Sequence, residues 1–273
     1  MKFSLTNEFK DRLREEILNS NIDFIQKSFD GVSYIDITEL LYEFDSKDSK
    51  FILDIIDFET SAKIISELDE DNRKNFLKIF SADEVAKIVD IIDSDDGADI
   101  LSELDVEFRG NVISLIVDSE KSKNLKELLR YDEDVAGGLM AIELVKCNIN
   151  WKINQCIDLI KKQAENVSNI YSVYVTDNKG KLLGKVSLKD ILLAKDNSRI
   201  KDIYDDFVIS VDAKMNQEEV SQIMQKYDLT VLPVVNKRGK LLGRITIDDV
   251  VDVITETAEE ERQIMSGITS DVE

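Results

Sequence analysis

The sequence predicts a mixed fold, in which an all-α, superhelical (solenoid-like) amino-terminal domain precedes a pair of β-α-β units and a connecting helix. A repeat of 24 residues with helical apolar spacing runs through the first half. A second repeat, offset by 59 residues, runs through β-branched segments and helical patterns in the second half. We therefore predict a helical domain at 1–130, a junction at 131–141, β-α-β units at 142–198 and 199–255, and the start of a connecting helix at 256–273.

The 24-residue repeat is clearest where residues 57–80 are set above residues 81–104. Ala62 then matches Ala86, and Ile64 matches Ile88. Units that begin near residues 33, 57, 81 and 105 share this pattern, and each holds two short helices. In the third unit the acidic segment 93–96 separates the two helices and supplies residues that cap the second one. Because a unit this small cannot bury its own apolar face, it must stack on its neighbours.

The chain before residue 33 shows a different pattern. One amphipathic helix is predicted at 7–19, and a loop is predicted around Asn21 and Gly31.

Composition excludes several classes of protein. The 273 residues carry a formal charge of −21, which argues against binding to nucleic acid or to an anionic membrane. The chain has no histidine, which is the commonest catalytic base and transition-metal ligand. Its two cysteines, Cys147 and Cys156, are too few for a disulfide framework or a four-ligand zinc site. With neither a signal peptide nor a long apolar run, the sequence predicts a cytoplasmic protein. The absence of histidine argues against an enzyme that relies on histidine chemistry.

The 59-residue repeat lays residues 176–190 over residues 235–249. Each copy has a glycine for a hairpin turn, a hydroxyl that caps the next helix, and an aspartate three residues later. The matched positions are Gly180 and Gly239, Ser187 and Thr246, and Asp190 and Asp249. This doubled pattern resembles a pair of cystathionine-β-synthase (CBS) domains, which pack as a pseudo-twofold module with clefts for nucleotides.

Three further segments narrow the resemblance. They are the junction 131–140, the run 227–235 with the only proline of the chain, and the acidic segment 247–261. Together with an acidic helical domain in front, they resemble the cytosolic part of an MgtE-type magnesium channel. The resemblance implies a homodimer formed through the CBS domains and a connecting helix that leads into a transmembrane pore domain of the same chain.

The acidic residues are concentrated in two segments. Residues 1–130 hold 31 acidic against 17 basic side chains, and residues 248–273 hold nine against one. Asp249, Asp252 and Glu256 lie at i, i+3 and i+7 of a predicted helix, on a face of like charges that a cation would neutralise. Magnesium prefers oxygen ligands and usually takes only one or two carboxylates at a site. The sequence therefore favours several Mg²⁺ sites.

The resemblance implies which residues bind the metal. They lie on the helical domain, at the junction, on the second CBS unit and on the connecting helix. The metal-binding candidates are Asp95, Asp99, Gly137 (through its carbonyl), Glu218, Asp228, Asp249, Asp252, Glu256, Glu259, Glu260 and Glu261. At low magnesium these acidic faces repel one another. At high magnesium bridging ions would close the dimer and shut the pore.

Other functions stay open on the sequence alone. The CBS resemblance implies an adenine-nucleotide cleft for ATP, with Tyr171, Ser187, Lys189 and Asp190 as contacts. Leu229, however, stands where an aromatic residue would stack on the adenine, and Lys189 replaces an arginine. A helical scaffold for a protein partner is a third interpretation. An enzyme with paired carboxylates is a fourth, for which the sequence offers no partnering nucleophile.

Overall fold

The computed structural model describes residues 6–164, 170, 172–195 and 197–265, except for some side chains towards the end of the last helix. The chain divides into two compact units. The first comprises residues 1–92 and 96–123, and the second comprises residues 93–95 and 124–273. Because each unit has its own packing, we describe them separately.

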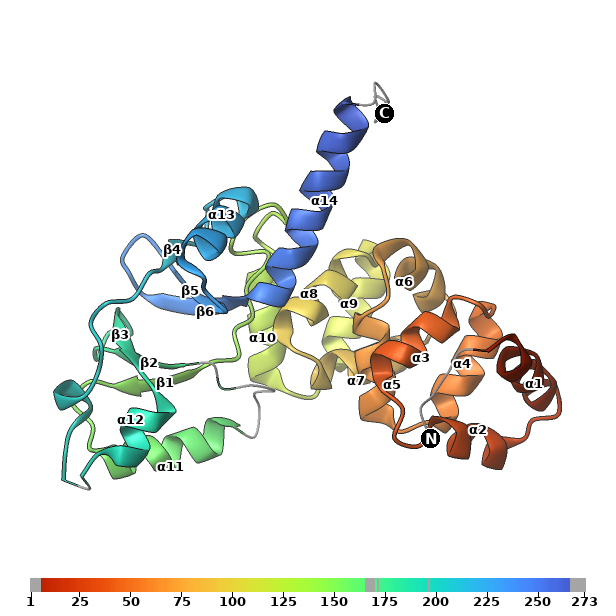
Figure 1. Cartoon of the computed structure of the whole chain (residues 1–273), viewed down its shortest axis with the longest axis horizontal. Coiled ribbons are helices and arrows are strands. Elements are labelled where there is room, and N and C mark those ends of the chain that lie inside the picture. The colour runs from red at the N-terminus through yellow and green to blue at the C-terminus, as the bar shows by residue number, and fades with distance from the viewer. Residues whose placement is uncertain (1–5, 165–169, 171, 196, 266–273) are drawn as a thin grey trace. The chain divides into compact units, whose positions relative to one another are not determined.

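The first unit is built from short helices that begin at regular intervals (Figure 1). From α2 to α9 each helix begins twelve residues after the previous one. The helices, the last of which ends in the second unit, are α1 (Asn7–Leu18), α2 (Ile22–Phe29), α3 (Tyr34–Leu41), α4 (Ser46–Ile55), α5 (Phe58–Ser66), α6 (Glu70–Leu77), α7 (Ala82–Ile91), α8 (Ser94–Ser102), α9 (Val106–Leu115) and α10 (Ser119–Leu128). The predicted units of 24 residues therefore correspond to helix pairs that begin with α3, α5, α7 and α9.

Side-chain caps fix these helix starts. Asp57 accepts a hydrogen bond from the Thr60 amide, and Asp105 accepts from the Phe108 amide. Ser81 forms a complete capping box with Glu84. Such caps satisfy amides that the first turn leaves without a partner, so the chain can start a new helix every twelve residues.

Several helices pack against the helix two positions further along the chain. α3 packs on α5, α5 on α7, and α7 on α9, which places equivalent helices of successive units in one row. The apolar positions predicted from the repeat form the core: Ala62, Ile64, Ala86 and Ile88 are all buried. The first half is thus a helical solenoid, as predicted.

One interaction of the solenoid recurs after three helices. Arg73 donates to the carbonyls of Ser66 and Leu68, and Arg109 donates to the carbonyls of Ser102 and Leu104 in the same way. This spacing of 36 residues equals three steps of twelve residues, so the elementary step is twelve residues and contains one helix. The 24-residue unit is two such steps.

The prediction of a loop around Asn21 and Gly31 is wrong. Residues 22–29 form helix α2, with Asn21 accepting a hydrogen bond from the Phe24 amide as its cap. Gly31 adopts a φ of 69° just after the helix. Both residues therefore mark the ends of a short helix that is stabilised by burying Ile25 and Phe29.

The second unit contains two three-stranded sheets of the same topology. In each sheet the middle strand pairs in parallel with the first strand and antiparallel with the third. The first sheet comprises β1 (Val145–Asn148), β2 (Val173–Thr176) and β3 (Leu182–Val186); the second comprises β4 (Val211–Asp212), β5 (Val231–Val235) and β6 (Leu241–Thr246). The helices are α11 (Ile153–Ala164), α12 (Leu188–Leu193), α13 (Gln217–Tyr227) and α14 (Ile247–Met265), with a 3₁₀ turn at Ile200–Asp202.

The 59-residue repeat is visible in matching details of the two sheets. Gly180 and Gly239 have φ values of 78° and 73° at the two hairpin turns, as predicted. Ser187 caps α12 by accepting from the Asp190 amide. The second half is therefore a tandem pair of β-α-β units, in agreement with the predicted fold class.

Helix α14 continues without a break across the boundary predicted at residue 255. The last helix of the second CBS unit and the start of the connecting helix are thus one element over the described residues. None of the described helices has both the length and the hydropathy needed to cross a bilayer.

Candidate functional site

The predicted ligands Asp95 and Asp99 lie one turn apart on α8. Ser94 and Asp95 belong to the second unit, while Asp99 belongs to the first. Ser94 is fully buried, Asp95 is partly buried and Asp99 is exposed. Within the first unit, Asp99 lies in electrostatic range of Arg73. A spacing of four residues places both carboxylates on one face of the helix, as a shared cation would require.

Asp249 lies in the first turn of α14, in a partly buried position. Its Oδ2 accepts hydrogen bonds from the Thr246 amide at 2.9 Å and from the Thr246 hydroxyl at 2.6 Å. Both bonds end on Oδ2. Burial raises the pKa of Asp249 above its ordinary value, while the bonds from Thr246 and the charge of Arg244 oppose that rise. Burial is thus the larger influence on this carboxyl group, and it disfavours the ionised form.

Gly137 lies beside the start of α13. Its amide donates to the carbonyl of Ala213 at 2.9 Å, and the Gln217 amide donates to the carbonyl of Asp134 at 2.9 Å. A side chain at Gly137 would overlap the ring of Tyr131, so only glycine fits this position. The junction therefore runs next to the first turn of α13.

Glu218 and Asp228 lie at opposite ends of α13. Glu218 is in the first turn, and Asp228 is the C-cap residue with a φ of 51°. At a rise of 1.5 Å per residue they are about 15 Å apart along the helix axis. One ion cannot bind both within a single chain, so these two predicted ligands would serve different sites.

The remaining predicted ligands are on the later part of α14. Their side chains lie outside the described residues, and only their place in the helix is given. They are Asp252, Glu256, Glu259, Glu260 and Glu261.

A buried arginine that the sequence analysis did not single out lies close to two of the described acids. Arg244 on β6 is 5% exposed and forms an ion pair with Asp93 at 3.1 Å. Its Nε donates to the carbonyl of Glu143 at 2.7 Å, and its charge also acts on Asp249. The sequence separations of 101 and 151 residues explain why no local motif could reveal these contacts.

The predicted nucleotide contacts lie at the end of β3 and the start of α12. Ser187, Lys189 and Asp190 are exposed, and the Ser187 hydroxyl donates to Asp190 at 2.6 Å. At the equivalent positions of the second CBS unit, Thr246 is buried and Asp249 is partly buried. Of the pairs Ser187–Asp190 and Thr246–Asp249, only Ser187–Asp190 is fully exposed. Tyr171 lies outside the described residues.

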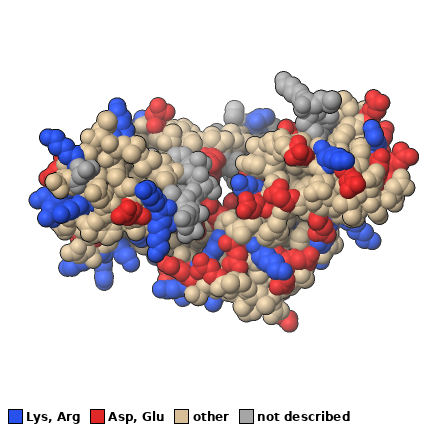
Figure 2. Space-filling view, turned by 90° about the horizontal axis from the view of Figure 1, so that it is seen from below, with Lys and Arg blue, Asp and Glu red and all other residues tan. Residues whose placement is uncertain are grey.

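Charge is unevenly distributed on the surface. In the view of Figure 2, lysine and arginine side chains gather over the first CBS unit at the left, and acidic side chains are frequent elsewhere. This agrees with the charge count, in which residues 131–247 are nearly neutral and the flanking segments are acidic.

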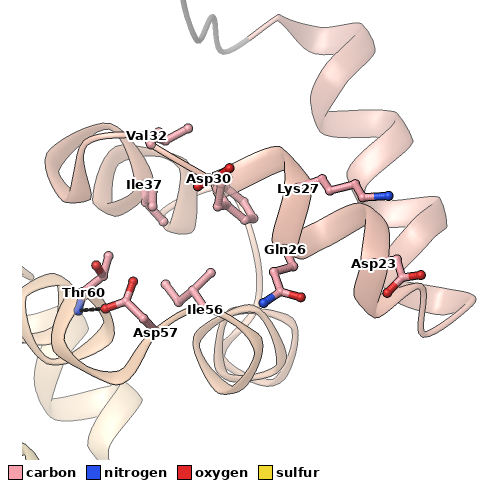
Figure 3. A pocket seen from close by; sticks show the side chains of 11 residues that line it. Asp23, Gln26, Lys27, Asp30, Val32, Ile37, Ile56, Asp57 and Thr60 are labelled. Carbon is pink, nitrogen blue, oxygen red and sulfur yellow. Dashed lines mark hydrogen bonds between the residues drawn. The ribbon is translucent and has the colours of Figure 1, made fainter.

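A hollow of about 570 Å³ in the first unit is formed by α2, α5 and the segments that precede α3 and α5 (Figure 3). Asp23, Asp30 and Asp57 line it together with Lys27. Asp23 and Asp57 lie on opposite sides of the hollow in Figure 3, and Asp57 caps α5 through the Thr60 amide. The carboxylates do not converge, and the hollow contains none of the predicted metal ligands.

Within the described part of the chain, no three acidic or cysteine side chains are grouped to hold an ion. Mg²⁺ keeps several of its waters and uses one or two carboxylates, so single exposed or half-buried carboxylates such as Asp95 and Asp249 match its chemistry.

Two families match the chain. Residues 32–134 match the MgtE intracellular N domain, and residues 134–197 and 200–256 match the CBS domain. The magnesium transporter MgtE of Thermus thermophilus is 38% identical over 54% of this chain and 32% of its own length. The corresponding protein of Enterococcus faecalis is 36% identical over 55% and 33%. The chain thus spans about a third of the length of these transporters.

Two solved structures match nearly the whole chain. The soluble part of a magnesium transporter is 30% identical with a TM-score of 0.80, and the match covers 92% of this chain and 98% of the other. The cytosolic domain of the Mg²⁺ channel MgtE in complex with ATP is 29% identical with a TM-score of 0.82, over 89% and 99%.

Proposed function

The chain belongs to the MgtE family of magnesium transporters, and from that premise we propose that it is a cytosolic Mg²⁺-sensing regulatory region. Magnesium bridges acidic faces of the N domain, the second CBS unit and the connecting helix. The ions draw the dimer into a closed state, and in a longer chain that state would shut a transmembrane pore. In this proposal the region binds Mg²⁺ and transmits the resulting conformational change, and it has no catalytic role.

One observation of the second unit carries this proposal. The buried Arg244 pairs with Asp93 just before α8 and acts electrostatically on Asp249 at the start of α14, where Asp248 adds a second carboxylate. The charge of Asp248 contributes to the raised pKa of Asp249, so these two carboxylates repel each other at the start of α14. Divalent ions acting at short range would offset this repulsion, whereas dissolved monovalent salt screens poorly at such distances.

The regulatory response requires differential binding. Each Mg²⁺ ion shifts the equilibrium only by the ratio of its affinities for the closed and open states. Ions shared between two acidic faces bind the closed state better, because the open state offers each ion fewer ligands. Several weak sites acting together would therefore give a steep response.

Neutralising the α8 ligands tests the proposal. In the double variant D95N/D99N, the Mg²⁺ concentration that gives half-maximal protection from limited proteolysis should rise by roughly tenfold, because two of the few shared ligands are lost. The variant D36N/E39Q is the matched control, since it removes two exposed acids of α3. Equal midpoints for the two variants would contradict the assignment of Asp95 and Asp99.

Nucleotide binding is the second candidate function. Ser187, Lys189 and Asp190 are exposed, and a matched structure is described as a complex with ATP. We expect calorimetry to detect ATP binding, and D190N to weaken it by at least about tenfold, because Asp190 would accept hydrogen bonds from the ribose. D158N, an exposed acid on α11, is the control. No heat of binding with or without Mg²⁺ would exclude this function.

Dimerisation is also part of the proposal. Helix α12 exposes Leu188, Leu192 and Leu193, with exposed fractions of 37%, 77% and 73%. Leu188 and Leu192 are four residues apart, so they share one helix face. We propose that this face, together with the adjacent Leu193, packs against the same surface of a second copy.

A further inference from the structure

We propose that Arg244 is a positioning residue that holds the start of α8 in place and thereby sets the Mg²⁺ concentration at which the region responds. The second half of this inference rests on the proposed function. The first half, the anchoring of α8, concerns the second unit alone and can be tested without magnesium.

The position of the Arg244 guanidinium is fixed from several directions. The backbone of Arg244 pairs with Ala141, with N–O distances of 2.8 and 2.9 Å in the two directions. Its Nε donates to the carbonyl of Glu143 at 2.7 Å, and one terminal nitrogen donates to Asp93 at 3.1 Å. Only 6% of the side chain is exposed. A buried arginine with directed, charge-assisted bonds acts as a rigid anchor rather than as a mobile surface charge.

Glu143 completes the attachment of α8. Its carboxylate accepts hydrogen bonds from the Ser94 amide at 3.1 Å and from the Ser94 hydroxyl at 2.7 Å. The Ser94 hydroxyl in turn accepts from the Ile142 amide at 2.9 Å. A carboxylate at this point also interacts favourably with the amino-terminal end of the helix dipole. The two residues Asp93 and Ser94 are thus held by Arg244 and Glu143.

This attachment places predicted ligands without touching a metal ion. Asp95 follows Ser94 directly, and Asp99 lies one turn further along α8. The charge of Arg244 also acts on Asp249 at the start of α14. If the first turn of α8 were free to move, ordering it would oppose ion binding and more Mg²⁺ would be needed.

The direction in which R244Q shifts the half-maximal Mg²⁺ concentration distinguishes a positioning role of Arg244 from a purely electrostatic one. Removing a positive charge among carboxylates should strengthen Mg²⁺ binding if Arg244 acts only through its field. Releasing the start of α8 should weaken it. We expect the half-maximal Mg²⁺ concentration to rise about fivefold to tenfold in R244Q, as the loss of charge-assisted hydrogen bonds would predict. R238Q is the matched control, because Arg238 is an exposed arginine of the same CBS unit.

Hydrogen exchange of the intact chain without Mg²⁺ tests the anchor itself. In R244Q the amides of residues 93–95 should exchange at least about tenfold faster than in wild type, while R238Q should match wild type. D93N and E143Q, which each remove one partner, should show the same local change if R244Q fails to fold. Unchanged exchange at the start of α8 in these variants would overturn the anchoring.

The two levels of the proposal fail in different ways. A lower Mg²⁺ midpoint in R244Q than in wild type would overturn the positioning role. A wild-type chain that does not respond to Mg²⁺ at all would overturn the proposed function. In that case the exchange data would still decide whether Arg244 anchors α8.

Discussion

Replacing Arg73 with methionine should destabilise the first unit by about 3–5 kcal/mol. Arg73 forms an ion pair with Glu103 at 2.5 Å, and the two side chains are only 12% and 5% exposed. Methionine would leave the Glu103 carboxylate buried without its partner. It would also leave the carbonyls of Ser66 and Leu68 without the hydrogen bonds that Arg73 donates.

The single tryptophan of the sequence allows the loss of stability in R73M to be assigned to one unit. The only tryptophan, Trp151, packs against the core of the first CBS unit, so its fluorescence reports on the second unit. Far-UV circular dichroism is dominated by the helices, most of which lie in the first unit. In R73M the dichroism transition in denaturant should shift strongly while the fluorescence transition should stay in place.

A neighbouring ion pair is the matched control. Lys74 pairs with Glu70 on the surface, where the two side chains are 42% and 65% exposed. K74Q should therefore change stability by less than about 0.5 kcal/mol. Equal effects of R73M and K74Q would show that the buried pair contributes no more than an exposed one.

The double variant L192D/L193D should convert a dimer into a monomer. Burying a leucine contributes about 1.5–3 kcal/mol, and the variant removes two leucines from each subunit of the proposed interface. The dimer should therefore weaken by more than about a thousandfold. Light scattering after size-exclusion chromatography should show a mass near 31.1 kDa for the variant and about twice that for wild type.

The control for this experiment is L18D. Leu18 at the end of α1 is 84% exposed, so the substitution places an aspartate at a comparably exposed leucine outside the proposed interface. L18D should stay dimeric. A wild-type chain that is monomeric, or an L192D/L193D variant that stays dimeric, would contradict the α12 interface.

Features of the fold that repeat could be predicted from the sequence. The 24-residue period predicted the helix starts near residues 57, 81 and 105, because each start carries its own capping side chain at Asp57, Ser81 or Asp105. The hairpin glycines of the CBS pair were predictable for the same reason, since a positive φ favours glycine.

Features that depend on distant partners could not be predicted. Strand β4 is only two residues long and is defined by its pairing with β5. Helix α2 lies between two residues that favour turns, and its stability comes from tertiary burial. The contacts of Arg244 could not be predicted for the same reason. Its partners Asp93 and Glu143 are far away in the sequence, and no local spacing identifies them.

The candidate site shows the same division. The bond between Thr246 and Asp249 follows from a spacing of three residues, and it realises the capping interaction that was one of two roles open to this aspartate on the sequence. The separation of Glu218 from Asp228 follows only from the length of α13, and it prevents one ion from binding both acids of a single chain.

Small-angle scattering during a magnesium titration tests the central claim most directly. Because Mg²⁺ is proposed to draw acidic faces together, the radius of gyration of the intact chain should fall at millimolar MgCl₂. It should not fall in NaCl of the same ionic strength, since screening alone does not supply bridging ions. A radius of gyration that stays constant in MgCl₂, or that falls equally in NaCl, would contradict magnesium sensing by this chain.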